Sequence, residues 1–277
     1  MKIAGIIPAR YYSTRFPGKP LAMIHGKPMV QHVYERARKA RNLDLLLVAT
    51  DTLLIFETVQ AFGGEAILTR EDHETGTDRL AEVSETLALA DEDIVVNIQG
   101  DEPLVQPRMI EVLVDALLQT EDAPMATLAF PSFDDDEFLN PHVVKVVMDM
   151  KGMALYFSRS PVPFRRDQSC GLGDWDRVPT ERPSSRAVME TVEREPADPV
   201  PSPERCGFLK HLGYYAYRAS FLKIFTSLSP TQLEQTEKLE QLRALEHGYS
   251  IRVAISPCQT VGVDTPEDLE KVITLLN

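Results

Sequence analysis

The sequence predicts a three-layer α/β fold with a mixed β-sheet and a small antiparallel extension. Apolar strand-like runs alternate with amphipathic helical runs through the first half of the 277 residues. This alternation is typical of βαβ units and of a mostly parallel sheet with helices on both faces. Further along, apolar runs at 143–148 and 154–157 are separated by a short turn that ends in Gly152. Such a pair predicts a hairpin, so part of the sheet is expected to be antiparallel.

The first half supplies four strands and four helices. Short apolar runs bounded by polar residues predict strands at 3–7, 45–50, 94–98 and 125–130. Apolar residues at helical spacing predict helices at 29–39, 53–62, 79–87 and 107–118. Pro28 stands where the first turn of a helix favours proline, and Gly63-Gly64 is expected to end the second helix.

The second half begins with an interruption. Residues 165–205 hold six prolines and sixteen charged residues, with no helical or strand period. We expect a Pro-rich, charged surface insertion at about 165–206, partly or wholly disordered. The alternative is a lid or a dimer arm anchored by Trp175. A strand at 211–217, helices from about 220 and at about 236–246, a strand at 251–255 and a helix at 266–275 complete a single domain over 1–277.

Composition narrows the functional classes. The chain has 42 acidic and 29 basic residues and a net charge of −13, which argues against nonspecific nucleic-acid binding. A local basic pocket could still bind a small anion. We expect no membrane span, because no run of about 18 apolar residues occurs. Cys170, Cys206 and Cys258 form an odd, sparse set without zinc-ligand spacing, and the start lacks the shape of a signal peptide, so a cytoplasmic protein is expected.

A basic loop follows the first predicted strand. Arg10, Arg15 and Lys19 lie four or five residues apart, among the small or hydroxyl residues Ser13 and Gly18. Three cations suit a polyanion such as a triphosphate, and backbone N–H groups can approach an anion closely in such a loop. Ligands of open α/β sheets bind at the carboxyl ends of strands, which favours binding over a merely solvated loop. The P-loop and the Gly-x-Gly-x-x-Gly pattern are both absent.

Two acidic motifs lie at the ends of predicted elements, one after a strand and one before a helix. Asp101 lies in Gln99-Gly100-Asp101 at the end of the 94–98 strand, and Asp264 precedes Thr265-Pro266 at a helix start. Each aspartate could simply serve a turn or a helix terminus. Next to a triphosphate loop, a Mg²⁺-binding role is favoured for Asp101, because Mg²⁺ prefers oxygen ligands and takes one or two protein carboxylates.

A third motif is Thr75-Gly76-Thr77, which opens the helix around Arg79 with a donor-rich terminus suited to a nucleotide. His73 precedes it and is the tempting general base. A lone histidine beside acidic residues on a loop is more commonly solvated, so His73 is given no role.

The motifs Pro8-Ala9-Arg10, Ser13-Thr14-Arg15 and Pro17-Gly18-Lys19-Pro20 together resemble the nucleotide-binding loop of sugar nucleotidyltransferases. More narrowly, the chain resembles the 3-deoxy-manno-octulosonate cytidylyltransferase (CMP-Kdo synthetase) family, which activates Kdo, the eight-carbon acid sugar of lipopolysaccharide. The resemblance implies a nucleotide-diphospho-sugar transferase-like (Rossmann-like) fold, CTP and Kdo as substrates, Mg²⁺ as cofactor and a homodimer. It extends over nearly the whole chain. Tyr12 and the long insertion depart from the family pattern.

The resemblance also implies roles for individual residues. The expected catalytic residues are Arg10, Lys19, Asp101 and Asp264, the two aspartates being the metal ligands. Nucleotide binding is expected from Ala9, Arg10, Ser13, Arg15, Lys19, Thr50, Asp51, Thr75, Gly76 and Arg79. Sugar binding is expected from Gln99, Arg159, His211, Tyr215, Glu240 and Gln241. Arg159 and His211 would meet the sugar carboxylate as cations, and the other four would meet its hydroxyls.

Four alternatives stay open. The sugar could be 8-amino-Kdo rather than Kdo, with the same mechanism. A sialic-acid or UTP-dependent transferase fits less well. A catalytically silent nucleotide-binding regulatory protein would not be expected to keep Arg10, Lys19, Asp101 and Asp264 all together. A dehydrogenase would bind NAD without Mg²⁺.

Overall fold

The computed structural model describes residues 1–12, 16–73, 75–166 and 207–276. Its central feature is a nine-stranded mixed sheet in which seven strands follow the order β11-β7-β10-β6-β1-β4-β5, and β8 joins β10 and β9 beside this path. Ser13, Arg15, Cys170, Trp175 and Cys206 lie outside the described residues, as does nearly all of the expected insertion. None of the helices in the described ranges combines the length and apolarity needed to cross a lipid bilayer.

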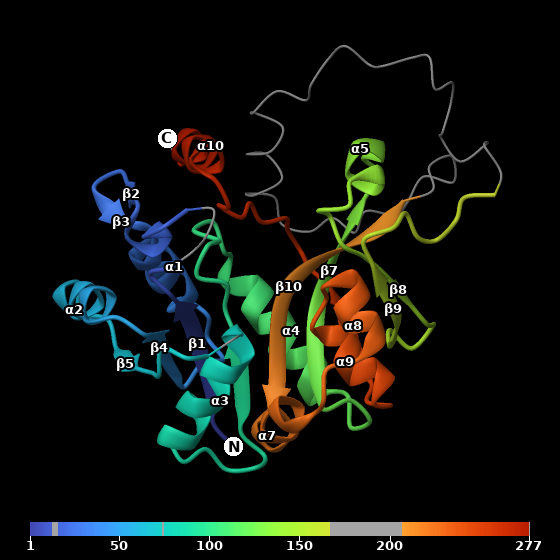
Figure 1. The fold of residues 1–277 in the computed structure, drawn as a ribbon, viewed down its shortest axis with the longest axis horizontal. Coiled ribbons are helices and arrows are strands. Elements are labelled where there is room, and N and C mark those ends of the chain that lie inside the picture. The colour runs from blue at the N-terminus through green and yellow to red at the C-terminus, as the bar shows by residue number, and fades with distance from the viewer. Residues whose placement is uncertain (13–15, 74, 167–206, 277) are drawn as a thin grey trace.

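The N-terminal half forms the parallel part of the sheet (Figure 1). β1 (Ile3–Ala9) pairs in parallel with β4 (Leu45–Thr50) on one side and with β6 (Ile94–Asn97) on the other, and β5 (Ala66–Leu68) pairs with β4. The three longer strands are buried almost throughout, as expected for apolar strands covered on both faces. The parallel direction places the carboxyl ends of β1, β4 and β6 side by side.

Helices cover both faces, which confirms the predicted three layers. One apolar cluster joins the sheet to α1 (Met29–Ala37), α2 (Leu53–Ala61) and α4 (Pro107–Leu118). A second cluster, on the opposite side, contains α3 (Gly76–Thr86), α7 (Ala219–Ser227) and α9 (Gln241–Glu246). The predicted stop after α2 is confirmed: Gly63 has φ +80°, and the N–H groups of Gly63 and Gly64 donate to Gln60 O and Val59 O, each at 2.9 Å.

The C-terminal half adds the antiparallel part. β10 (Phe208–Arg218) lies antiparallel between β6 and β7 (Met125–Ser132), and β11 (Ile251–Ile255) runs parallel to β7 at the edge. β8 (Lys145–Met148) and β9 (Ala154–Ser158) form the predicted hairpin. The register of β10 against β7 shifts between His211 and Tyr215, with Gly213 at φ +73°. This bulge lies beside the end of β6, because Tyr215 pairs with Asn97.

Two expectations about helices were wrong. The helix expected at 236–246 is two short helices, α8 (Gln232–Glu237) and α9, because Lys238 adopts φ 53° and ends the first. Pro28 is not in the first turn of α1 but precedes it as an extended N-cap residue. The sequence patterns also missed the short strand β5 and three further small elements: a 3-10 turn η1 (Lys19–Leu21), a two-stranded sheet of β2 (Met23–Ile24) and β3 (Lys27–Pro28), and α5 (Asp135–Leu139).

The last helix returns to the N-terminal half of the molecule. α10 (Pro266–Leu275) begins at Thr265 with a capping box, in which Thr265 and Asp268 satisfy each other's backbone N–H groups. Its apolar residues pack with Ile24 and Met29 in a small third cluster, so α10 lies next to β2 and β3 (Figure 1). This return places Asp264, just before the helix, over the carboxyl edge of the parallel strands.

Candidate functional site

The candidate site lies at the carboxyl edge of β1, β4 and β6. Arg10 follows β1, Asp51 follows β4, and Asp101 follows β6 within a short turn. The strand order changes direction at β1, since β4 and β6 lie on its two sides, and ligands of open α/β sheets bind at such a crevice. Val263 N–H donates to Asp101 O at 2.9 Å, which ties the segment before α10 to this edge.

Lys19 joins the two candidate metal carboxylates. Its Nζ lies 2.7 Å from Asp101 Oδ2 and 3.5 Å from Asp264 Oδ1, and the Lys19 side chain is only 14% exposed. Gly18 positions it: φ +70° turns the chain into η1, and Gly18 N–H donates to Tyr11 O at 2.9 Å. The structure therefore brings together three residues that are 82 and 245 positions apart in sequence.

These residues line a cavity of about 190 Å³. Its walls are Pro8, Ala9, Arg10, Lys19, Pro20, Gln99, Gly100, Asp101 and Asp264. The turn after β6 lies directly against β1, because a Cβ added at Gly100 would come within 2.6 Å of Pro8 O. Only glycine allows this approach, which explains why the acidic motif contains one.

The donor set fits a divalent cation that also binds substrate. Mg²⁺ prefers oxygen ligands and commonly uses one or two carboxylates plus substrate phosphates. Asp101 and Asp264 supply two carboxylates that already share one cation, the Lys19 ammonium group. Within the described ranges there is no group of three or more His, Cys, Asp or Glu side chains that could hold a metal by itself. An ion here would therefore take its remaining ligands from substrate and water.

A second cavity, of about 300 Å³, adjoins the first. It is lined by Pro8, Ala9, Arg10, His73, Thr75, Gly76 and Arg79, so Pro8, Ala9 and Arg10 line both cavities. The N-terminus of α3 forms one wall, where Thr75 is the N-cap and accepts from Asp78 N–H at 3.1 Å. Exposed donors and the positive end of the helix dipole favour a polar or anionic ligand here.

Arg79 forms a buried ion pair at the base of this cavity. Its Nη2 lies 3.0 Å from Asp51 Oδ2, with the two side chains 4% and 9% exposed. Arg79 Nη1 also donates to Thr69 Oγ1 and, at 3.4 Å, to Arg70 O. Thr50, at the end of β4, is fully buried. Arg79 is thus held rigidly between β4 and the loop that precedes α3, while one buried oxygen, Asp51 Oδ1, has no partner.

The expected sugar-binding residues gather around the bulge of β10. Gln99 Nε2 donates to Gly213 O, His211 Nε2 lies 2.9 Å from Thr127 Oγ1, and the rings of His211 and Tyr215 are 5.5 Å apart. Glu240 reaches the same region by accepting from Thr77 Oγ1 at 2.6 Å.

Several buried polar atoms of this region lack partners. They are Asn97 Oδ1, Glu240 Oε1 and Gln241 Nε2. Buried polar groups are costly to leave unpaired, so their gathering beside the bulge favours a hydrogen-bonding ligand. Burial also raises the pKa of Glu240, against the hydrogen bond from Thr77.

The expectation that His211 carries a positive charge is wrong. Burial lowers the pKa of His211 to about 3, so its imidazole is neutral near pH 7 and can only hydrogen-bond. Arg159 is charged, but its Nε donates to Glu237 O at 2.7 Å and its Nη1 to Pro141 O at 3.0 Å. In this structure Arg159 therefore ties the end of β9 to α8.

The interpretation of His73 as a solvated residue is also wrong. Its side chain is 7% exposed, and Nε2 contacts the Glu82 carboxylate. Glu82 lies three residues beyond Arg79 on α3, so the two side chains share one face of the helix. That i, i+3 spacing was the available signal, but only the position of the loop shows what Glu82 contacts. Two expected nucleotide-binding residues, Ser13 and Arg15, lie outside the described residues.

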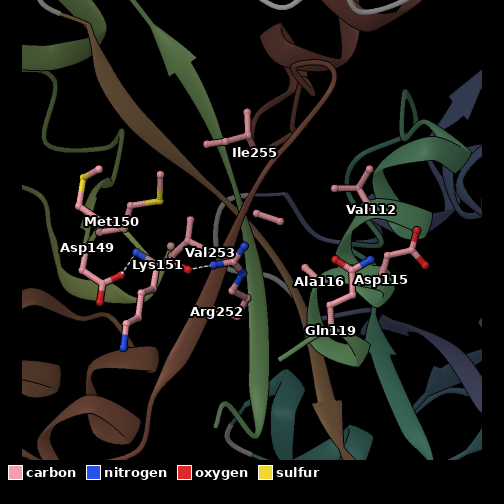
Figure 2. A pocket seen from close by; sticks show the side chains of 13 residues that line it. Val112, Asp115, Ala116, Gln119, Asp149, Met150, Lys151, Arg252, Val253 and Ile255 are labelled. Carbon is pink, nitrogen blue, oxygen red and sulfur yellow. Dashed lines mark hydrogen bonds between the residues drawn. The ribbon is translucent and has the colours of Figure 1, made fainter. Parts of the chain in front are cut away.

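A third cavity, of about 570 Å³, lies elsewhere, between α4, the turn after β8 and β11 (Figure 2). Val112, Ala116, Val253 and Ala254 give it an apolar lining, and Arg252 donates to Lys151 O across it. It shares no residue with the two cavities above. The candidate site is therefore the pair of adjoining cavities at the carboxyl edge.

Comparison with known proteins gives consistent results. Residues 4–252 match the family model described as "Cytidylyltransferase". The chain is 57% identical over 276 residues to the 3-deoxy-manno-octulosonate cytidylyltransferase of Syntrophobacter fumaroxidans, covering 100% of this chain and 97% of the relative. It is 50% identical over 276 residues to the protein of the same name from Geotalea daltonii, covering 100% and 98%.

A solved structure, CMP:2-keto-3-deoxy-manno-octonic acid synthetase complexed with CTP, is similar with a TM-score of 0.82 and 42% identity, covering 100% of this chain and 98% of that one. A 4-diphosphocytidyl-2C-methyl-D-erythritol synthase is similar in fold, with a TM-score of 0.58, 14% identity and coverage of 100% and 99%.

Proposed function

This chain belongs to the 3-deoxy-manno-octulosonate cytidylyltransferase family, and on that premise we propose that it transfers the cytidylyl group of CTP to Kdo, giving CMP-Kdo and pyrophosphate. The observation that carries the proposal is the Lys19–Asp101–Asp264 cluster beside Arg10 at the carboxyl edge of the sheet. It combines the cations that a triphosphate needs with the carboxylates that a phosphate-bound metal needs.

The residues divide between the two cavities. The smaller cavity, with Lys19, Asp101 and Asp264, takes the triphosphate and the reacting atoms. The larger one takes the cytidine half, against Thr75, Gly76 and Arg79, with Thr50 and Asp51 behind Arg79. Ala9 and Arg10 line both cavities, as expected for residues beside the phosphate that joins the two halves. Ser13 and Arg15 are proposed to assist at the triphosphate on the family resemblance alone.

The sugar enters beside the bulge of β10. Gln99, just after β6, and Tyr215, on β10, flank it. Glu240 and Gln241 carry unpartnered polar atoms that sugar hydroxyls would satisfy. Neutral His211 is a hydrogen-bonding partner rather than a counter-ion. Arg159 is the cation of this group, and its role toward the sugar carboxylate requires it to release backbone carbonyls that it now binds.

The transfer is one in-line displacement. The anomeric hydroxyl oxygen of Kdo forms a bond to the α-phosphorus of CTP and loses its proton to solvent. The bond from that phosphorus to the bridging oxygen breaks, and its electron pair leaves with pyrophosphate. Arg10 and Lys19 hold the β- and γ-phosphates and neutralise the charge that develops on the leaving group. Positioning and charge neutralisation supply the catalysis, so no covalent enzyme intermediate is required.

Asp101 and Asp264 are proposed to hold Mg²⁺. The ion would neutralise phosphate charge and lower the pKa of a nearby sugar hydroxyl. Their part is to present two carboxylates to the triphosphate in the cavity that Arg10 also lines. For this, Lys19 must exchange the two aspartates for phosphate oxygens, which are anionic partners of the same kind.

Three further properties are proposed on the family resemblance: a role in lipopolysaccharide biosynthesis, a homodimer and a cytoplasmic location. Cys258 is a buried free thiol, whose pKa burial raises to about 11. An unreactive thiol of this kind is compatible with a reducing compartment. Light scattering coupled to gel filtration would test the dimer.

Pyrophosphate release tests the substrates. The assay compares CTP with Kdo, with 8-amino-Kdo and with no sugar, and uses UTP with Kdo as the nucleotide control, all with Mg²⁺. Release that requires both CTP and Kdo is expected. A preference for 8-amino-Kdo would keep the mechanism and change the sugar, whereas no release with either sugar would overturn the proposed function.

A further inference from the structure

The loop that walls the cytidine cavity is held from behind by α3. Two side chains of α3 form hydrogen bonds with the backbone of Arg70. Arg70 N–H donates to Glu82 Oε2 at 3.1 Å and Oε1 at 3.3 Å, and Arg70 O accepts from Arg79 Nη1 at 3.4 Å. Arg79 and Glu82 are one helical turn apart on α3. Two side chains of one rigid helix therefore fix the start of the loop.

His73 connects Glu82 to the cavity, because its side chain contacts the one and lines the other. Its Nε2 contacts Glu82 Oε2, and its side chain is 7% exposed while that of Glu82 is 27% exposed. The same His73 side chain lines the cavity together with Thr75 and Gly76. A wall of the cavity is thus bonded to a carboxylate that does not itself line the cavity.

The charge state of Glu82 suits this task. Burial alone would raise the pKa of Glu82, but the hydrogen bonds from His73 and from the Arg70 amide together hold it below its ordinary value. Glu82 is therefore an ionised acceptor near pH 7, and hydrogen bonds to an ionised acceptor are stronger than those between neutral groups.

We propose that Glu82 and His73 are positioning residues for the nucleotide: Glu82 fixes the loop against α3, so that His73, Thr75 and Gly76 present a preformed wall to the cytidine half of CTP. This inference rests on the proposed function, because it assigns a use to the same cavity. Neither residue is required at the reacting atoms, which lie with Lys19, Asp101 and Asp264 in the adjoining cavity.

The contacts of Glu82 with Arg70 and His73 lie beside the cytidine cavity, and this position predicts which kinetic constant changes. Without Glu82, the Arg70 N–H and His73 Nε2 lose the carboxylate that they contact. CTP binding energy must then offset the entropy cost of ordering the loop. The loss should therefore appear in the KM for CTP, by about tenfold for removal of charge-assisted hydrogen bonds that are partly exposed. The kcat and the KM for Kdo should stay within about twofold, because the other cavity is unchanged.

The experiment compares Glu82→Ala, Glu82→Gln and His73→Ala with the matched control Glu85→Ala, which alters an exposed glutamate of the same helix. The measurements are kcat, KM for CTP, KM for Kdo, and Tm. Glu82→Ala should raise the KM for CTP about tenfold relative to Glu85→Ala. Glu82→Gln should recover part of this loss, because its amide oxygen can still accept from the Arg70 N–H but the bond is no longer charge-assisted. A merely structural role would lower Tm without this split between the two KM values.

The proposal is overturned if the KM for CTP in Glu82→Ala matches that of Glu85→Ala, or if kcat falls while that KM is unchanged. Should Glu82→Ala fail to fold, His73→Ala decides, with a KM for CTP at least about threefold above the control expected. If wild type and Glu85→Ala both fail to turn over CTP with Kdo, the proposed function has failed. The positioning role of Glu82 and His73 is then tested separately by calorimetric titration of the same variants with CTP. An affinity for CTP equal to that of Glu85→Ala overturns this role.

Discussion

Replacing Gly100 by alanine should lower the catalytic efficiency sharply at a modest cost in stability. A Cβ at this position would lie 2.6 Å from Pro8 O and 3.4 Å from Ile7 Cγ2. Carbon atoms of this kind stay at least 3.0 Å from such a neighbour, so the gap must open by 0.4 Å or more (3.0 minus 2.6). Pro8 belongs to a strand paired on both sides. The turn that carries Gln99 and Asp101 is therefore the part that shifts.

Two magnitudes follow for Gly100→Ala. Overpacking of this size costs about 1–3 kcal/mol of unfolding free energy, which lowers Tm by about 4–8 °C if the cost is about 2 kcal/mol. Displacing Asp101 relative to Lys19 by a sizeable fraction of 1 Å should lower kcat/KM by about 10- to 100-fold.

The assay is pyrophosphate release with CTP, Kdo and Mg²⁺, with Tm followed by circular dichroism. The control is Gly26→Ala, at φ +80° with no heavy atom within 4 Å of the new methyl group. It strains the backbone by about 1 kcal/mol but should leave kcat/KM unchanged. Full activity in Gly100→Ala would refute the close packing of the acidic turn on β1 as a requirement for the site.

Three other predictions follow. Because the pKa of His211 is about 3 in the folded chain against 6.5 as its ordinary value, the unfolded chain takes the proton first. The free energy of unfolding of wild type, compared with that of His211→Gln, should therefore stay constant above pH 6.5 and fall below it, by about 2 kcal/mol at pH 5. Equal pH profiles of the two proteins in urea unfolding would contradict this. Asp51→Ala leaves the 4%-exposed Arg79 without its ion partner and should cost about 3 kcal/mol of unfolding free energy, whereas a cost below 1 kcal/mol in urea titration would show that the pair is unimportant. Chelation by EDTA should stop pyrophosphate release and added Mg²⁺ restore it, with unaffected release counting against the metal role of Asp101 and Asp264.

Local sequence signals predicted the first residue of two helices correctly. α4 begins at Pro107 and α10 at Pro266, both prolines in a first turn, and α10 follows the capping residue Thr265. These signals act over three or four residues, so they can be recognised without knowledge of the fold. The place of Asp101 was predictable for another reason: it follows a parallel strand, and ligands of such sheets bind at the carboxyl ends of the strands. Asp264 reaches the same edge only because α10 returns to pack with Ile24 and Met29.

What the sequence did not reveal depends on tertiary partners. Lys238 carries no sign of the left-handed conformation that splits the expected 236–246 helix. The charge of His211 depends on burial around the β10 bulge, and the pairing of His73 depends on where its loop meets α3. In each case the chemistry of the residue was plain, but its environment came from segments distant in sequence.

Asp101 and Asp264 are proposed to act as one unit on the transferred phosphate. A double-mutant cycle in kcat/KM for pyrophosphate release tests this proposal most directly, using Asp101→Asn, Asp264→Asn and the combined variant, each with Tm near that of wild type. If both carboxylates serve one cation, each single change should cost at least about 100-fold and the combined change hardly more. Losses that multiply, or near-normal turnover in either single variant, would contradict the account.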